Sequence, residues 1–279
     1  MNSTLLCGRF ELSLERPLVM GIVNVTPDSF SDGSRYFDAR AAIDHARCLV
    51  EQGADILDVG GESTRPGAEP ISARDELARV LPVIDGLRDC GVPVSVDTFK
   101  PEVMREALAA GVDMINDVYG FRREGAVQAV AAFRCAVCVM HMQGEPKTMQ
   151  LSPSYRDVAA EVGQFLRERA ALLERAGVQR ERIVLDPGFG FGKTVAQNYE
   201  ILRHWTGMGL DAYPGLLGVS RKSMIGSVTG RPVSDRLAGS LSAVLAGIAR
   251  GAKIVRVHDV AQTVDALKVW QAVEFGVSE

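Results

Sequence analysis

The sequence of 279 residues contains neither an apolar stretch long enough to span a bilayer nor an excess of basic residues. A transmembrane helix needs about 20 consecutive apolar residues. Lysine and arginine total 31 against 35 aspartate and glutamate residues, which gives a formal net charge of −4. Proteins that bind nucleic acids or membrane surfaces usually carry a basic patch or stripe, so we expect neither class of partner.

The chain also has few cysteines and no secretory signal at its start. Residues 1–4 lack the basic region and the long apolar core of a signal peptide. Five cysteines, an odd number, favour free thiols in a reducing cytoplasm. Cys135 and Cys138 have the Cys-x-x-Cys spacing of zinc and redox sites. They lie on a predicted strand, where residues three apart point to opposite faces, and no second pair completes a zinc site.

What the sequence does contain is a series of short apolar runs, most of which lead into a polar residue. The eight runs lie at residues 18–23, 56–59, 94–96, 114–115, 137–140, 183–185, 216–219 and 254–255. Runs of this length are typical of buried parallel strands. Asn24, Asp97, Asn116, Asp186 and Arg256 follow five of them directly. Because the carboxyl ends of the strands of a (β/α)8 barrel meet at one face, these side chains predict an active site there.

Between these runs lie segments with apolar residues at helical spacing, at 39–52, 73–89, 101–110, 157–176, 235–250 and 260–274. A glycine that can close a helix in the left-handed conformation follows five of them, at positions 53, 91, 111, 177 and 251. Ser72 with Asp75 resembles a capping box, and Pro101 suits a first helical position. The alternative, an open doubly wound sheet, would need fewer strands and usually a glycine-rich turn after the first strand.

We therefore predict an α/β protein that folds as a (β/α)8 TIM barrel. Its length is close to the ~250 residues typical of one such barrel. Because no linker or low-complexity tract divides the chain, residues 1–279 are expected to form a single domain. Residues 5–14 are expected to form a short N-terminal hairpin or strand that packs under the barrel floor.

A glycine-rich segment at residues 186–194, with the sequence DPGFGFGKT, looks like a phosphate-binding P-loop at first sight. It does not match that pattern, because Pro187 occupies the position of the first glycine. Two interpretations remain. One is a flexible loop at the barrel mouth, and the other is a loop that holds Phe191 over a flat ligand beside Asp186. An unpaired acid at the end of an apolar strand is costly to bury, which favours the second interpretation.

Two long motifs are the most specific part of the sequence: MGIVNVTPDSFSDG at 20–33 and DVGGESTRPG at 58–67. Shorter ones follow at 95–101, 140–144, 186–193, 220–223 and 256–259. In this order, and from Met20 to His258, they resemble the bacterial dihydropteroate synthases of the folate pathway. The departures are Ser34, where the family often has glycine, and Phe99, where it often has a small residue.

The resemblance implies an enzyme that transfers an alkyl group other than methyl. Such an enzyme joins (7,8-dihydropterin-6-yl)methyl diphosphate to 4-aminobenzoate and releases 7,8-dihydropteroate and pyrophosphate. The resemblance also implies Mg²⁺ as the cofactor and a homodimer as the assembly. It further implies that sulfonamides compete for the 4-aminobenzoate pocket.

By this resemblance, the pterin is bound by Asp97, Asn116, Met140, Asp186, Phe191, Lys222 and Arg256. The carboxylate of Asp186 can accept two adjacent N–H groups from the 2-amino-4-oxo edge of a pterin. Asn116 offers both a donor and an acceptor, while Asp97 accepts from a further ring N–H. Lys222 donates to the carbonyl and ring-nitrogen side. Arg256 lies flat on the pterin face, where stacking of a guanidinium group is favourable.

The leaving group is an anion, and TIM barrels commonly bind phosphate after strands seven and eight. The resemblance assigns the diphosphate to Asn24, Thr64, Arg256 and His258, and it assigns Mg²⁺ to Asn24. Mg²⁺ keeps several waters beside phosphate oxygens, so one amide oxygen from the protein is sufficient.

The resemblance places 4-aminobenzoate against Phe30, Thr64, Arg65, Pro66 and Ser223, with Phe191 also beside its ring. It assigns catalysis to Asp32, Arg65 and Lys222. Asp32 would stabilise the cation that forms when pyrophosphate leaves, in a closed and drier site. The neutral aniline nitrogen then attacks without a strong general base. The long loops after the first two strands are expected to be mobile lids.

Other interpretations remain open. Asp97 alone could cap the helix at Pro101, Asn116 could hold a turn, and Arg256 could be a surface cation. The remaining histidines are interpreted as structural: His45, His141 and His204. One alternative function is methyl transfer from methyltetrahydrofolate to a corrinoid protein, which has no use for a diphosphate site. Another is a non-catalytic paralogue that binds a ligand or partner.

Overall fold

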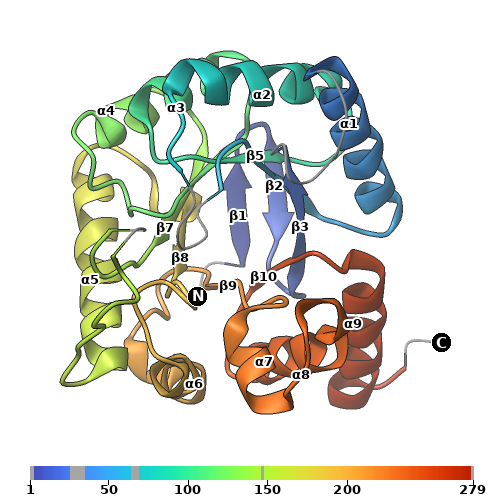
Figure 1. Cartoon of the computed structure of the whole chain (residues 1–279), viewed down its shortest axis with the longest axis vertical. Helices are drawn as coiled ribbons and strands as arrows, with labels where there is room; N and C mark the ends of the chain where they lie inside the picture. Colours follow the sequence, from blue (N-terminus) through green and yellow to red (C-terminus); the bar gives the residue numbers. More distant parts are fainter. Residues whose placement is uncertain (1–2, 26–34, 64–68, 146–147, 278–279) are drawn as a thin grey trace.

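Eight parallel strands form a barrel that helices surround (Figure 1). This computed structural model describes residues 3–25, 35–63, 69–145 and 148–277, with the backbone alone for 35–38. The barrel strands are β3 (Leu18–Asn24), β4 (Ile56–Gly60), β5 (Val94–Asp97), β6 (Met114–Asp117), β7 (Ala136–Met140), β8 (Ile183–Asp186), β9 (Leu216–Leu217) and β10 (Ile254–Val257). They coincide with the eight predicted runs.

The order of neighbouring strands is β8-β7-β6-β5-β4-β3-β10-β9. The two ends of this series meet, because Leu185 of β8 forms a parallel bridge with Gly215, directly before β9. Its N–H also donates to the carbonyl of Pro214 at 3.0 Å. The predicted (β/α)8 TIM barrel is therefore confirmed, and the open doubly wound sheet is wrong.

The described helices are α1 (Arg35–Glu51), α2 (Ala73–Gly86), α3 (Pro101–Ala109), α4 (Ala126–Ala131), α5 (Val158–Arg175), α6 (Val195–Arg203), α7 (Ser223–Thr229), α8 (Leu237–Ile248) and α9 (Val260–Phe275). The six predicted helical segments are found within a few residues of their expected bounds. The sequence analysis did not predict α4, α6 and α7, which have six, nine and seven residues.

The predicted helix ends are also found. The side chain of Ser72 accepts from the N–H of Asp75 at the start of α2, and α3 begins at Pro101. The five glycines predicted to follow helices have left-handed φ angles between 83° and 105°. Each of these glycines therefore adopts a backbone conformation that other residues take only with strain.

The predicted N-terminal hairpin consists of β1 (Thr4–Cys7) and β2 (Phe10–Ser13), paired antiparallel. Leu5, Cys7 and Leu14 are buried from solvent and form one core with residues at the beginnings of the barrel strands. The strand residues of this core are Leu18, Met20, Ile56, Met114, Ala136, Cys138, Val184, Leu216 and Ile254. The hairpin thus fills the barrel floor, as expected, and leaves the opposite end for polar side chains.

The two cysteines of the Cys-x-x-Cys spacing belong to different cores. Cys138 lies in the floor core, whereas Cys135 lies in the larger core between the strands and the helices. Burial raises the pKa of Cys135 to about 12 and the pKa of Cys138 well above its usual value. None of the five cysteines is in a disulfide. The prediction that the pair points to opposite faces is confirmed, which excludes a shared metal or redox site.

The described part of the chain contains no helix that is long and apolar enough to cross a membrane.

The glycine after α5 provides a test of the helix-closing role. Gly177 has φ of 97°, and a Cβ built there would meet no atom within 4 Å. Gly177→Ala should therefore lower the free energy of unfolding by about 1–2 kcal/mol through backbone strain alone. Gly207→Ala is the matched control, because its nearest neighbour would be 3.9 Å away and its φ lies outside the left-handed range. Equal urea midpoints for the two variants would contradict the role of Gly177.

Candidate active site

The polar residues that follow the strands lie together at the carboxyl end of the barrel. In the sheet register, Asp97 of β5 is the neighbour of Asn116 of β6, and Met140 of β7 is the neighbour of Asp186 of β8. Gly60 lies between Asn24 and Asp97 in the same register. The predicted convergence of strand-end residues at one face is therefore confirmed for these positions.

Arg256 is the centre of this cluster. Its Nε donates to Oδ2 of Asp58 at 2.6 Å, and its Nη2 donates to Oδ2 of Asp97 at 3.0 Å. Asn116 also donates to Oδ2 of Asp58 through Nδ2, at 3.1 Å. The interpretation of Arg256 as a surface cation is wrong, because its guanidinium group joins two acids inside the barrel mouth.

Asp58 is a site residue that the sequence analysis missed. Its side chain is fully buried, although it lies within the apolar run at 56–59. A charged residue inside such a run was the available signal, since burial of an unpaired carboxylate is costly. The Oδ1 atoms of Asp58 and Asp97 are buried and have no hydrogen-bond partner among the described residues. The site thus presents two acceptor atoms that a ligand with N–H groups would satisfy.

The charge state of Asp97 reflects its burial. Burial raises the pKa of this carboxyl to about 7, with Arg256 opposing the rise and Asp58 adding to it. The structural alternatives for Asp97 and Asn116 are wrong. The residue before α3 is Lys100, which forms no side-chain cap, and Asn116 contacts Asp58 rather than a turn.

Asp186 and Lys222 face each other across Gly218. A Cβ built at Gly218 would lie 3.8 Å from Oδ2 of Asp186, 3.9 Å from Nζ of Lys222 and 4.0 Å from Cβ of Arg256. Burial raises the pKa of Asp186, and Lys222 opposes this. Burial lowers the pKa of Lys222 to about 8, and Asp186 opposes that shift. The absence of a side chain at Gly218 leaves space between an acid and two cations.

Phe191 lies beside this space. The Nζ of Lys222 is 4.9 Å from the centroid of the Phe191 ring and also donates to the carbonyl of Phe189. Phe191 is half-buried and packs against an apolar cluster that includes Met140. The structure therefore brings Asp97, Asn116, Met140, Asp186, Phe191, Lys222 and Arg256 to one end of the barrel, as predicted.

Lys193 explains why the glycine-rich segment is not a P-loop. Its buried Nζ lies 3.0 Å from Nδ1 of His141 and donates to the carbonyls of Gly188 and Phe191 at 2.9 Å. The lysine thus holds its own loop instead of reaching toward phosphate. Burial and then the Lys193 charge lower the pKa of His141 to about 2, so His141 is a neutral acceptor. The structural interpretation of His141 is confirmed.

The candidate diphosphate side has two described groups besides Arg256. His258 is half-buried after β10, with Nδ1 3.0 Å from Oγ of Ser220. Asn24 is half-buried at the end of β3, and its Oδ1 would lie 3.9 Å from a Cβ at Gly60. Ser223 is exposed as the first residue of α7. The other predicted site residues, Phe30, Asp32, Thr64, Arg65 and Pro66, lie outside the described residues, as do parts of both predicted lids.

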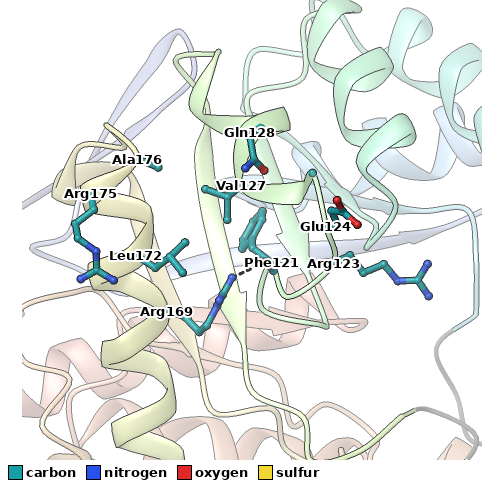
Figure 2. Close-up of a pocket in the computed structure, with 10 residues that line it drawn as sticks. Phe121, Arg123, Glu124, Val127, Gln128, Arg169, Leu172, Arg175 and Ala176 are labelled. Carbon is teal, nitrogen blue, oxygen red and sulfur yellow. Dashed lines mark hydrogen bonds between the residues drawn. The ribbon is translucent and has the colours of Figure 1, made fainter.

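A pocket of about 520 Å³ lies elsewhere, between α4 and α5 (Figure 2). It contains none of the predicted site residues. Figure 2 shows Arg123 and Arg175 pointing away from each other, and Arg169 donates to the carbonyls of Gly120 and Phe121. Because its polar groups do not converge on a common point, this pocket lacks the arrangement that ligand sites usually have.

Comparison with known proteins agrees with the geometry. Residues 20–258 match the family described as pterin binding enzyme. The dihydropteroate synthase of Neisseria meningitidis serogroup C is 53% identical over 270 residues, which is 95% of each chain.

Two solved structures superimpose closely on the chain. The Xanthomonas albilineans dihydropteroate synthase with 4-aminobenzoic acid has a TM-score of 0.92 and 52% identity, covering 99% of each chain. The Burkholderia cenocepacia enzyme complexed with 7,8-dihydropteroate has a TM-score of 0.88 and 52% identity, covering 97% of this chain and 96% of that one. With its family match and these relatives along nearly the whole chain, the protein belongs to the dihydropteroate synthase family of pterin binding enzymes.

Proposed function

We propose that the protein condenses (7,8-dihydropterin-6-yl)methyl diphosphate with 4-aminobenzoate to give 7,8-dihydropteroate and pyrophosphate. The observation that carries this proposal is the pair of buried carboxylates, Asp58 and Asp97, that share Arg256 and each keep one oxygen without a partner among the described residues. A pterin edge is rich in N–H donors, which such oxygens accept. Family members crystallised with 4-aminobenzoic acid and with 7,8-dihydropteroate support both halves of the reaction.

The pterin is proposed to lie over Gly218, between Asp186 and Lys222. Asp186 accepts from the N–H of Gly188 at 2.7 Å through Oδ1, and its Oδ2 faces the space above Gly218. That carboxylate then accepts adjacent pterin N–H groups, while Lys222 donates to the carbonyl and ring-nitrogen side of the pterin. The guanidinium of Arg256, fixed by Asp58 and Asp97, stacks on the ring.

The diphosphate is proposed to bind Asn24, Arg256 and His258, together with Thr64. The described residues include no group of three or more His, Cys, Asp or Glu that would hold a metal. The amide oxygen of Asn24 nevertheless fits Mg²⁺, since it is a hard ligand beside the side-chain-free Gly60. Asn24 would hold the ion together with diphosphate oxygens, and bound Mg²⁺ would neutralise part of the charge on the leaving group.

The reaction is proposed to begin with cleavage of the bond between the methylene carbon and the diphosphate oxygen. The electron pair leaves on pyrophosphate, and the dihydropterin stabilises the resulting methylene cation with the help of Asp32. The neutral nitrogen of 4-aminobenzoate then forms the new C–N bond and loses a proton. Lys222 and Ser223 are proposed to receive the benzoate carboxylate, with Arg65 beside it and Phe30, Pro66 and Phe191 around the ring.

The protein is further proposed to work in the cytoplasm as a homodimer. Its five cysteines are free, as is usual in a reducing compartment. A groove of about 490 Å³, lined largely by apolar residues, runs between α6, α7 and α8. It includes Ile225, Ala243, Ala246 and Val228, of which Val228 is 66% exposed. A second copy would cover this apolar surface.

The first prediction from the proposed function separates binding from catalysis. Wild-type protein with both substrates and Mg²⁺ should form dihydropteroate and pyrophosphate in equal amounts. Asp186→Asn should weaken pterin diphosphate binding by about 3 kcal/mol, roughly a hundredfold, because a charged acceptor is lost. Asp32→Ala should instead lower kcat with little change in pterin affinity. Asp211→Asn, at an exposed turn, is the control. Full turnover by Asp32→Ala would exclude the cation-stabilising role.

The second prediction concerns pH. Asp97 is a much stronger acceptor of N–H groups when it is charged, so kcat/KM for the pterin substrate should rise with pH through about 7. Lys222 is a much stronger donor when it is charged, so the same parameter should fall above about pH 8. Asp97→Asn should remove the rising limb, which distinguishes this carboxyl from titration of the substrate diphosphate. An unchanged rising limb in that variant would contradict the assignment.

The third prediction concerns assembly. Val228→Arg places a charge in the groove between α6, α7 and α8, so it should convert a dimer to a monomer in light scattering coupled to gel filtration. Val273→Arg is the matched control, because Val273 is 75% exposed on α9, away from the groove. A wild-type monomer, or a Val228→Arg dimer, would refute this interface.

A further inference from the structure

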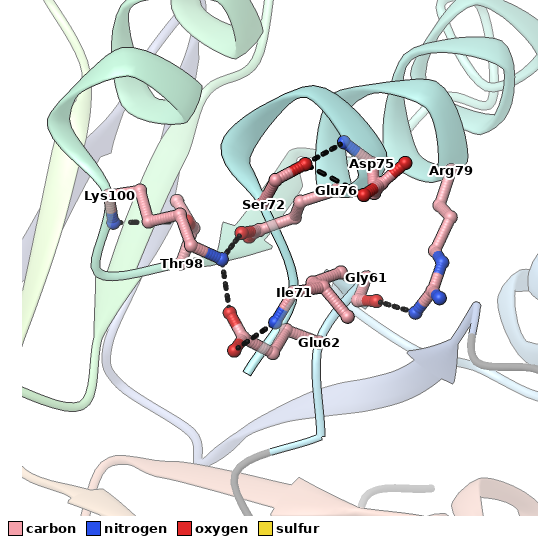
Figure 3. Close-up of polar contacts among 9 residues, drawn as sticks. All are labelled: Gly61, Glu62, Ile71, Ser72, Asp75, Glu76, Arg79, Thr98 and Lys100. Carbon is pink, nitrogen blue, oxygen red and sulfur yellow. Dashed lines mark hydrogen bonds and ion pairs between the residues drawn. The ribbon is translucent and has the colours of Figure 1, made fainter. Parts of the chain in front are cut away.

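Lys100 is buried between two glutamates, next to the candidate site (Figure 3). Its Nζ forms ion pairs with Oε2 of Glu62 and with Oε2 of Glu76, the latter at 2.5 Å. The three side chains are 10%, 7% and 1% exposed respectively. Glu62 follows β4, Glu76 belongs to α2, and Lys100 is the residue before α3. A single ammonium group therefore joins three separate parts of the barrel rim.

Stability is a poor explanation for this arrangement. Removing three charges from water costs several kcal/mol per ion, and well-packed apolar residues often stabilise a protein as well or better. Glu76 shows the cost directly, because its Oε1 is buried without a hydrogen-bond partner among the described residues. Burial raises the pKa of Glu76, and the hydrogen bonds from Lys100 and Thr98 oppose the rise. The cluster thus fits a positioning role better than a purely stabilising one.

The element that the cluster fixes is the chain after β4. Glu62 accepts from the N–H of Ile71 at 3.2 Å through Oε1, which ties the two ends of segment 63–70 together. Arg79 of α2 donates to the carbonyl of Gly61 at 2.8 Å. A Cβ at Gly61 would lie 2.7 Å from Val80, so the chain at this point packs directly on α2. Figure 3 shows the contact of Glu62 with Ile71 and that of Arg79 with Gly61.

We propose that Lys100 is a positioning residue for the aminobenzoate half of the reaction, acting through Glu62 on both ends of segment 63–70. The inference rests on the proposed function, which assigns 4-aminobenzoate contacts to Thr64, Arg65 and Pro66 within that segment. The pterin contacts of Asp97 and Arg256 do not pass through Glu62. Loss of the tie therefore affects the second substrate and spares the first.

The test compares Glu62→Gln and Lys100→Met with two controls of the same chemistry. Glu174→Gln removes the charge of an ion pair on the outside of the barrel, and Lys268→Met changes an exposed lysine. Both test variants should raise KM for 4-aminobenzoate at least tenfold, equivalent to 1.4 kcal/mol. The dissociation constant of Glu62→Gln for the pterin diphosphate should stay within about twofold of wild type, because this variant keeps the Lys100–Glu76 pair near Asp97. The controls should change neither parameter.

The double variant Lys100→Met/Glu62→Gln should raise this KM no further than the worse single variant, because both act through one contact. If Lys100→Met does not fold, Glu62→Gln decides alone, since it keeps the Lys100–Glu76 pair. An unchanged KM for 4-aminobenzoate in Glu62→Gln, or an equal loss of pterin affinity, would overturn the positioning role only. Absence of dihydropteroate with the wild-type protein would instead refute the proposed function and this role with it.

Discussion

The ion pairs of Arg256 are the interaction on which the rest of the site depends. One guanidinium group holds two buried carboxylates, Asp58 and Asp97, which lie 198 and 159 residues away in sequence. They meet because β10 pairs with β3, which in turn pairs with β4, so that the parallel sheet brings Arg256 close to Asp58 and Asp97. Without that cation, two neighbouring buried carboxylates would lack a charged partner, which is costly. The acceptor character of the pocket is thus a consequence of the closed sheet.

The barrel separates this polar end from an apolar one. The N-terminal hairpin fills the floor with Leu5, Cys7 and Leu14. The described polar groups at the strand ends therefore do not take part in the packing of the floor. At the mouth, Lys193 holds the glycine-rich loop in place by donating to the carbonyls of Gly188 and Phe191. That contact fixes a loop whose Phe189 carbonyl accepts from Lys222. Buried polar groups at this end therefore hold the residues that face the proposed ligand in place.

The sequence predicted those features that depend on the pattern of neighbouring residues. An apolar run that ends in a polar residue revealed the strands and, with them, the positions of Asp97, Asn116 and Asp186. Asp58 was not predicted, because it lies inside an apolar run rather than at its end. Its side chain points into the barrel, and its partner Arg256 comes from the last strand. The contacts of Lys100 and Lys193 were not predicted for a similar reason. The spacing of residues along the sequence does not indicate which loops meet at the rim of a barrel. The roles of Phe30, Asp32, Thr64, Arg65 and Pro66 stay predictions.

The two halves of the proposed reaction are supported in different ways. Most residues proposed to bind the pterin lie on the barrel strands, whose hydrogen-bonded register fixes their positions directly. The residues proposed to bind 4-aminobenzoate come mainly from the connections after β3 and β4, and most of them lie outside the described residues. A connection that carries chemistry needs fixed ends, and a buried charge cluster supplies them with directional contacts that apolar packing lacks. The free energy lost by burying Lys100, Glu62 and Glu76 is then explained by their role, which is to fix both ends of segment 63–70 relative to a rigid pocket.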